Sequence, residues 1–189
     1  MKRKIIALTG KIGSGKSAVA HILRDFGYET VDCDMLARQV ASRADVVARV
    51  ERLLGSEYVV SGELNRKAIR ETVFNDGNLL NKYQQIFFDG VKELLIEALA
   101  NLEDCKAVFV EIPVLDAFSF NWDEIWRVES SEKDCISRVV ERDSVSVDNV
   151  FATLSRQKVY DCTCVIENNG DLVKLNQIVK NALVKSRLK

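Results

Sequence analysis

The residues of this chain best suited to chemistry stand in a glycine-rich segment near the N-terminus. Residues 10–17 read Gly-Lys-Ile-Gly-Ser-Gly-Lys-Ser and match the phosphate-binding pattern G-x-x-x-x-G-K-[ST]. The glycines that let the backbone N–H groups point at phosphate oxygens are Gly10, Gly13 and Gly15. Lys16 can reach the β- and γ-phosphates, and the Ser17 hydroxyl can bind Mg²⁺. The segment therefore predicts binding of a nucleoside triphosphate.

The flanking sequence supplies the context that such a loop needs. The apolar run over residues 4–9 predicts a strand before the loop. Apolar residues then recur at helical spacing, which predicts a helix over 16–26 whose positive end faces the same anion. The alternative is a glycine-rich turn that binds no ligand, and this context disfavours it.

Strand and helix signals alternate along the chain, which predicts an α/β fold with a five-stranded parallel sheet flanked by helices. The expected strands cover residues 4–9, 28–33, 107–112, 124–129 and 163–167. The expected further helices cover residues 35–54, 65–74, 79–102, 131–142 and 147–158, and a last helix follows residue 170. Residues 57–60 are extended in character and precede a Ser-Gly turn.

Two connections between the expected strands are longer than a single crossover helix requires. The long helical segment between the second and third strands predicts an inserted acceptor-binding lobe over residues 35–104. The helix pair between the fourth and fifth strands predicts a lid over residues 131–159. The nucleotide-binding core then comprises residues 1–34, 105–130 and 160–189.

Two carboxylates, Asp32 and Asp34, come at the end of the second expected strand. The carboxyl ends of parallel strands form the ligand crevice, so these residues are expected beside the phosphate loop. If the strand reaches Asp34, alternation places both carboxylates on the same side. One of them can then orient an acceptor hydroxyl or act as a general base. The alternative is that Asp34 only caps the helix that follows.

Two arginines, Arg138 and Arg142, stand four residues apart and share one face of an expected helix. Beside a nucleotide they can clamp phosphates and stabilise charge that develops in the transition state. The alternative is a solvated helix face on which Glu141 and Asp143 are their partners.

Further charged residues fit the same chemistry. Glu111 ends an apolar strand and can stand behind Mg²⁺, or it can simply bind a backbone group. In the expected lobe Arg38, Arg66, Lys67 and Arg70 can hold an anionic acceptor, and their alternative is ordinary solvation.

The bulk composition narrows the class of protein. A net charge of −1 gives no general basic field for nucleic acid. No apolar run approaches the length of a membrane span, and no signal peptide precedes the first strand, so we expect a cytoplasmic protein. The single histidine, His21, is expected on the exposed face of its helix, which argues against histidine general-base chemistry. The sequence gives no signal of oligomeric state.

These motifs recur with others in a fixed order along nearly the whole chain. The segments are Leu8-Thr9-Gly10, Gly13-Ser14-Gly15-Lys16-Ser17, Asp32-Cys33-Asp34 with Ala37-Arg38, Leu64-Asn65-Arg66 to Arg70 and Phe74, Pro113-Val114-Leu115, Arg138 to Arg142-Asp143, and Ile166-Glu167-Asn168-Asn169-Gly170. In this combination the chain resembles the dephospho-CoA kinase family.

The resemblance implies a P-loop kinase fold with an acceptor domain and a lid. It implies transfer of the γ-phosphoryl group of ATP, with Mg²⁺, to the ribose 3′-hydroxyl of dephospho-CoA, the last step of coenzyme A synthesis. The implied catalytic residues are Asp34, Lys16 and Arg142. The nucleotide-binding residues that we expect are Gly10, Gly13, Ser14, Gly15, Lys16, Ser17, Ala18 and Arg138, with Mg²⁺ at Ser17 and with Glu111 as a further candidate ligand of the ion. The acceptor-binding residues that we expect are Asp34, Arg38, Arg66 and Arg70.

The chain also departs from the family pattern, mostly in acceptor and adenine-side regions. Phe88-Asp89 stands where His-Pro is usual, Ala117 where glutamate is usual, and the segment 157–162 is short and lacks an expected arginine. In the loop region Lys11 replaces a usual glycine and Ala18 a usual threonine. These changes bear on acceptor affinity more than on phosphoryl transfer. They leave open a related kinase with another nucleotide-like acceptor. A nucleotide-binding module without catalysis is a further alternative, and the retained Lys16, Asp34 and Arg142 argue against it.

Overall fold

The computed structural model describes residues 3–73, 76–102 and 105–188 of the chain. It divides into two compact units, which we name the core unit and the helical unit. The core unit comprises Met1–Asp32, Leu102–Leu115 and Phe120–Lys189, and the helical unit comprises Cys33–Asn101 and Asp116–Ser119. In the described part of the chain, no helix combines the length and the apolar character that crossing a membrane requires.

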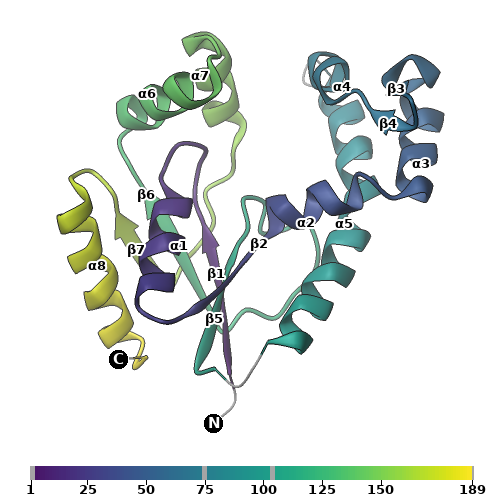
Figure 1. Ribbon diagram of the computed structural model, residues 1–189. Helices are drawn as coiled ribbons and strands as arrows, with labels where there is room; N and C mark the ends of the chain where they lie inside the picture. The colour runs from purple at the N-terminus through teal and green to yellow at the C-terminus, as the bar shows by residue number, and fades with distance from the viewer. Residues whose placement is uncertain (1–2, 74–75, 103–104, 189) are drawn as a thin grey trace. The chain divides into compact units, whose positions relative to one another are not determined.

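The core unit is built on a parallel sheet (Figure 1). Its strands are β1 (Lys4–Thr9), β2 (Glu29–Asp32), β5 (Ala107–Glu111), β6 (Glu124–Glu129) and β7 (Cys164–Glu167). Within the described residues these five strands follow the order β2-β5-β1-β6-β7, and every pair is parallel. The sequence Ala-Val-Phe-Val-Glu of β5 is buried throughout, as expected for a strand inside a parallel sheet. The predicted five-stranded parallel sheet is confirmed.

The described residues of the core unit also form four helices, which lie in two groups. They are α1 (Lys16–Asp25), α6 (Glu132–Asp143), α7 (Val147–Arg156) and α8 (Leu172–Lys185). The helices α1 and α8 pack on one face of the sheet, where Leu23 and Leu183 meet Trp126 in a single apolar cluster. In Figure 1, α6 and α7 lie beyond the carboxyl ends of β1 and β6. These two helices share a second cluster, which is built on Cys135 and Leu154.

Local sequence signals explain where these helices begin and end. The side-chain oxygens of Ser131, Ser146 and Asp171 accept hydrogen bonds from N–H groups in the first turns of α6, α7 and α8. Gly27, at φ +83°, follows α1 in a left-handed conformation. The N–H group after it bonds back to the carbonyl of Leu23 at 3.0 Å, which is a Schellman ending.

Glu124 at the start of β6 accepts hydrogen bonds from Lys4 of β1 and from Ser186 near the end of the chain. It accepts hydrogen bonds from Lys4 at 2.7 Å, from the Ser186 hydroxyl at 2.7 Å and from the indole of Trp126 at 3.0 Å. Burial acts to raise the pKa of Glu124, but these hydrogen bonds outweigh it and the net pKa lies below its usual value. Folding is therefore favoured by the ionised form of this carboxyl group.

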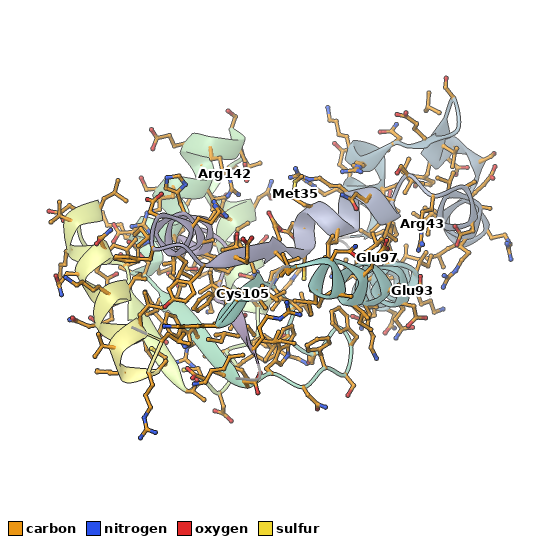
Figure 2. All side chains as sticks on the ribbon, turned by 60° about the horizontal axis from the view of Figure 1, so that its bottom comes forward. Met35, Arg43, Glu93, Glu97, Cys105 and Arg142 are labelled. Carbon is orange, nitrogen blue, oxygen red and sulfur yellow. The ribbon has the colours of Figure 1, made fainter. Side chains whose placement is uncertain are left out.

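The helical unit holds the segment between β2 and β5. Its elements are α2 (Cys33–Val40), α3 (Ala44–Leu54), a 3₁₀ turn η1 (Ser56–Tyr58), the hairpin β3 (Val59–Val60) and β4 (Glu63–Leu64), α4 (Arg66–Val73) and α5 (Gly77–Asn101). A Cβ atom on Gly90 of α5 would lie 2.9 Å from a methyl group of Val40, so this glycine allows α2 to pack closely. Arg43 donates to Glu93 of α5 at 3.3 Å, and Figure 2 labels both side chains.

The structure corrects three sequence expectations. The second strand ends at Asp32, because that residue pairs with Glu111, the last residue of β5, and no ladder remains beyond it. Cys33 therefore starts a helix, so the condition under which alternation places Asp32 and Asp34 on the same side is not met. Of the expected extended segment, Glu57 and Tyr58 belong instead to the 3₁₀ turn. The expected end of a helix at Phe74 lies outside the described residues.

Candidate active site

The glycine-rich loop between β1 and α1 has a backbone that only glycine suits. Gly10, Gly13 and Gly15 have φ values of +145°, +75° and +96°. A Cβ atom at each would also collide with a neighbour: the carbonyl oxygen of Val128, the backbone of Cys135 and the side-chain amide of Asn168, respectively. Part of the loop backbone therefore has a left-handed conformation, and the loop packs closely against β6, α6 and the end of β7. Burial raises the pKa of the Cys135 thiol beneath it.

The start of α1 adds positive charge to this loop. Lys16 is the first residue of the helix, and its ammonium group donates to the carbonyls of Gly10 at 3.0 Å and Lys11 at 3.3 Å. The first N–H groups of a helix have no partner within the helix and point along its axis. Ala18 is half-buried in the same turn, and its N–H group donates to the carbonyl of Gly15. Loop, ammonium group and helix start together form an anion-binding site.

A hydroxyl and a carboxylate meet at the adjacent edge of the sheet, where a second acidic residue stands on the neighbouring strand. The Ser17 Oγ donates to Oε1 of Glu111 at 2.8 Å, although the two residues stand far apart in the sequence. Glu111 is only 9% exposed at the end of β5, and Asp32 pairs with it in register on β2. Oxygen donors of this kind suit Mg²⁺, which usually keeps several water ligands and phosphate oxygens as well. The residues therefore fit the predicted ion.

Arg138 of α6 makes contacts that the sequence did not predict. Its Nη1 donates to the carbonyls of Gly13 at 3.1 Å and Ser14 at 3.4 Å, and to the Ser130 hydroxyl at 3.0 Å. Its Nη2 donates to the carbonyl of Asn168 at 3.1 Å. Arg138 thus binds the backbone of the phosphate loop, and a direct contact with phosphate stays a prediction.

Asn168 was missed as a site residue. It follows β7 directly, is 7% exposed, and its side-chain nitrogen donates to the carbonyl of Ser14 at 2.8 Å. A signal was present in the sequence, because a polar Asn-Asn-Gly at the carboxyl end of a parallel strand points to the ligand edge of the sheet.

Arg142 lies at the C-terminal end of α6 and is labelled in Figure 2. Its side chain is 63% exposed and makes two hydrogen bonds to Asp143, at 2.8 and 2.7 Å. Asp143 is one of the two partners, with Glu141, that the solvated-face alternative expected. A role for Arg142 toward phosphate stays a prediction.

The expected acceptor residues lie in the helical unit. Asp34 is exposed in the first turn of α2, inside the helix rather than before it, and Arg38 follows one turn later on the same face. Arg66 and Arg70 are exposed and stand one turn apart on α4. Their roles toward an acceptor stay predictions.

A pocket of about 220 Å³ adjoins the phosphate loop within the core unit. Its lining includes Lys11 of the loop, Arg127 of β6 and Tyr160, which follows α7. Pockets that enclose a drug-sized ligand measure roughly 300–1,000 Å³. This pocket can therefore take only part of a nucleotide.

Comparison with known proteins decides the family. The family model described as dephospho-CoA kinase matches residues 4–174. The chain belongs to the dephospho-CoA kinase family. The dephospho-CoA kinase of Thermus thermophilus is 36% identical over 188 residues, which cover 95% of this chain and 90% of that one. The dephospho-CoA kinase of Staphylococcus epidermidis is 31% identical over 190 residues, which cover 95% and 94%.

Solved structures agree with this assignment. A crystal structure of a Thermus thermophilus protein aligns with a TM-score of 0.82 at 33% identity and covers 98% of both chains. The dephospho-CoA kinase of Campylobacter jejuni aligns with a TM-score of 0.68 at 19% identity, again over 98% of both chains, and supports the fold. The family resemblance and the P-loop kinase fold predicted from the sequence are confirmed. A dephospho-CoA kinase family member is an ATP-dependent kinase, so the module without catalysis is disfavoured.

Proposed function

We propose that this chain transfers the γ-phosphoryl group of ATP to the ribose 3′-hydroxyl of dephospho-CoA, in the cytoplasm and with Mg²⁺. Family membership supports the reaction class and the acceptor. The observation that carries the proposal is the hydrogen bond from Ser17 to Glu111, at 2.8 Å, beside an ammonium group already bound to the loop. Such a set of groups suits the β- and γ-phosphates of a nucleoside triphosphate.

The loop would bind the triphosphate through its N–H groups and the start of α1. Lys16 would exchange the carbonyls of Gly10 and Lys11 for β- and γ-phosphate oxygens, which requires only a short movement of a flexible side chain. Binding groups that are already in place lose little freedom when charge develops on the transferred group, and this lowers the barrier.

Ser17 and Glu111 are the residues that would hold Mg²⁺, with Asp32 beside Glu111 on the neighbouring strand. When bound, the ion neutralises charge on the β- and γ-phosphate oxygens. The Ser17 hydroxyl donates its proton to Glu111, and its oxygen keeps lone pairs that can bind the ion.

Asp34 would orient the acceptor hydroxyl and accept its proton. Asp34 is an exposed residue in the first turn of α2. The anionic groups of the acceptor would be bound by Arg38, Arg66 and Arg70, which are exposed. A guanidinium group can donate two parallel hydrogen bonds to two oxygens of one phosphate. Arg142 would exchange Asp143 for a phosphoryl oxygen.

A comparison of acceptors tests the proposal. ADP release is measured with ATP and Mg²⁺ in the presence of dephospho-CoA, adenosine, deoxyadenosine or no acceptor. The highest kcat/KM is expected with dephospho-CoA, and only slow ATP hydrolysis is expected without an acceptor. Efficient turnover with adenosine or deoxyadenosine and none with dephospho-CoA would show that the proposed acceptor is wrong, although the chain would still be a kinase.

A further inference from the structure

Asn168 binds the phosphate loop through the carbonyl of Ser14. Its backbone is anchored independently of its side chain: its N–H group donates to the carbonyl of Glu129 at 2.7 Å, and its carbonyl accepts from the Ser130 hydroxyl at 2.7 Å. The side-chain nitrogen is therefore fixed in place, and it donates to the carbonyl of Ser14 at 2.8 Å in a buried environment. Arg138 reaches the same carbonyl and that of Gly13.

These contacts determine which way the loop N–H groups point. In a trans peptide the carbonyl and the N–H group face opposite directions. Holding the carbonyls of Gly13 and Ser14 thus directs the N–H groups of Ser14 and Gly15 to the other side. The Ser14 N–H group closes the turn onto the carbonyl of Lys11 at 3.2 Å. The Gly15 N–H group is thereby turned away from the Asn168 side chain, and an N–H group in such a loop can bind an anion.

The restraint is needed because glycine makes the loop easy to rearrange. Rotation of the peptide between Ser14 and Gly15 changes φ of a glycine, which tolerates positive and negative values about equally. The rotated peptide would present a carbonyl oxygen to the phosphate in place of an N–H group. Gly15 therefore cannot by itself fix the orientation of this peptide.

We propose that Asn168, assisted by Arg138, is a positioning residue that keeps the Ser14–Gly15 peptide in the orientation that binds the triphosphate. Its role is in nucleotide affinity and not in contact with the acceptor. The proposal rests on the chain being an ATP-dependent kinase, and it does not depend on which acceptor is used.

The test is Asn168→Asp, which replaces the donor with an oxygen of the same size facing the Ser14 carbonyl. The matched control is Asn169→Asp, one residue further on. The Asn169 side chain accepts a hydrogen bond from the N–H group of Ser131 at 2.8 Å, and a carboxylate can accept it equally well. Both variants carry the same added charge. Equilibrium binding of ATP and of inorganic triphosphate, melting temperature, and KM for each substrate are measured.

We expect Asn168→Asp to weaken binding of ATP and of triphosphate by about 10-fold or more, because a buried acceptor loses its donor. The KM for dephospho-CoA should match that of Asn169→Asp. The melting temperature should be lower in Asn168→Asp, because its new carboxylate is buried without a donor. Relative to the wild type, nucleotide affinity should recover at low pH, where the protonated carboxyl group donates again. Equal ATP affinity in the two variants would overturn the proposal. If Asn168→Asp does not fold, Asn168→Ser, whose hydroxyl is too short to reach Ser14, is compared with the wild type in the binding and KM assays. ATP affinity equal to that of the wild type would then overturn the proposal.

Discussion

Replacement of Gly13 by alanine separates backbone strain from displacement of the phosphate loop. Gly13 and Gly27 have similar φ values of +75° and +83°, so an alanine at either position incurs left-handed strain of about 1–2 kcal/mol. Around Gly27 nothing lies within 4 Å of the new Cβ atom. At Gly13 the new Cβ atom would stand 2.8 Å from the Cα atom of Cys135 and nearer still to its carbonyl oxygen.

Only the change at Gly13 should therefore alter catalysis. Ordinary van der Waals contact begins at 3.4 Å, and the obstructing atoms are helix backbone, so loop and α6 must move apart. Overpacking of this kind destabilises by about 1–3 kcal/mol. A displacement of about 1 Å near the reacting groups lowers the rate by about 10²-fold. We expect kcat/KM for ATP to fall by about 10²-fold in Gly13→Ala and to remain unchanged in Gly27→Ala.

Two measurements check this reasoning. Urea unfolding gives the stability of both variants, and it should fall by about 1–2 kcal/mol for Gly27→Ala and by more for Gly13→Ala. Steady-state kinetics at saturating dephospho-CoA gives kcat/KM for ATP. Wild-type kinetics in Gly13→Ala, or an equal loss of activity in both variants, would refute the claim that contact with α6 fixes the loop.

Three further predictions follow from the site and the fold. Asp34→Asn should lower kcat by about 10²-fold with little change in ATP binding, whereas the control Asp45→Asn, in the first turn of α3, should leave kcat unchanged. Equal activity of the two variants would mean that Asp34 only stabilises its helix. Glu111→Gln should raise the Mg²⁺ concentration for half-maximal activity about 10-fold, as titration of the ion would show, and an unchanged requirement would contradict its role. Glu124→Gln should lower the free energy of unfolding at pH 7. The difference in this free energy between variant and wild type should disappear as the pH falls through the lowered pKa of Glu124, where the wild type also loses its charge. A difference that persists at acid pH would be inconsistent with that pKa.

The sequence predicted the fold well because its signals are local. The bounds of β1 and β6 match the predicted strands, since apolar runs and turn residues mark them. The meeting of Ser17 and Glu111 was also within reach, because parallel strands bring their carboxyl ends to one edge of the sheet.

Other features depend on tertiary contacts for which the sequence has no local signal. The end of β2 at Asp32 is set by the length of its partner strand. The hydrogen bond from Asn168 to the carbonyl of Ser14 joins segments from opposite ends of the chain. Arg138 was recognised by its spacing, but its partners in the loop backbone follow from the packing of α6 onto Gly13.

The most direct measurement follows the terminal phosphate of ATP to its destination. With isotopically labelled γ-phosphate, Mg²⁺ and dephospho-CoA, we expect the label on the ribose 3′-hydroxyl of the product, and none on an analogue that lacks this hydroxyl. Label recovered only as inorganic phosphate, or transferred equally well to the 3′-deoxy analogue, would contradict the proposed reaction.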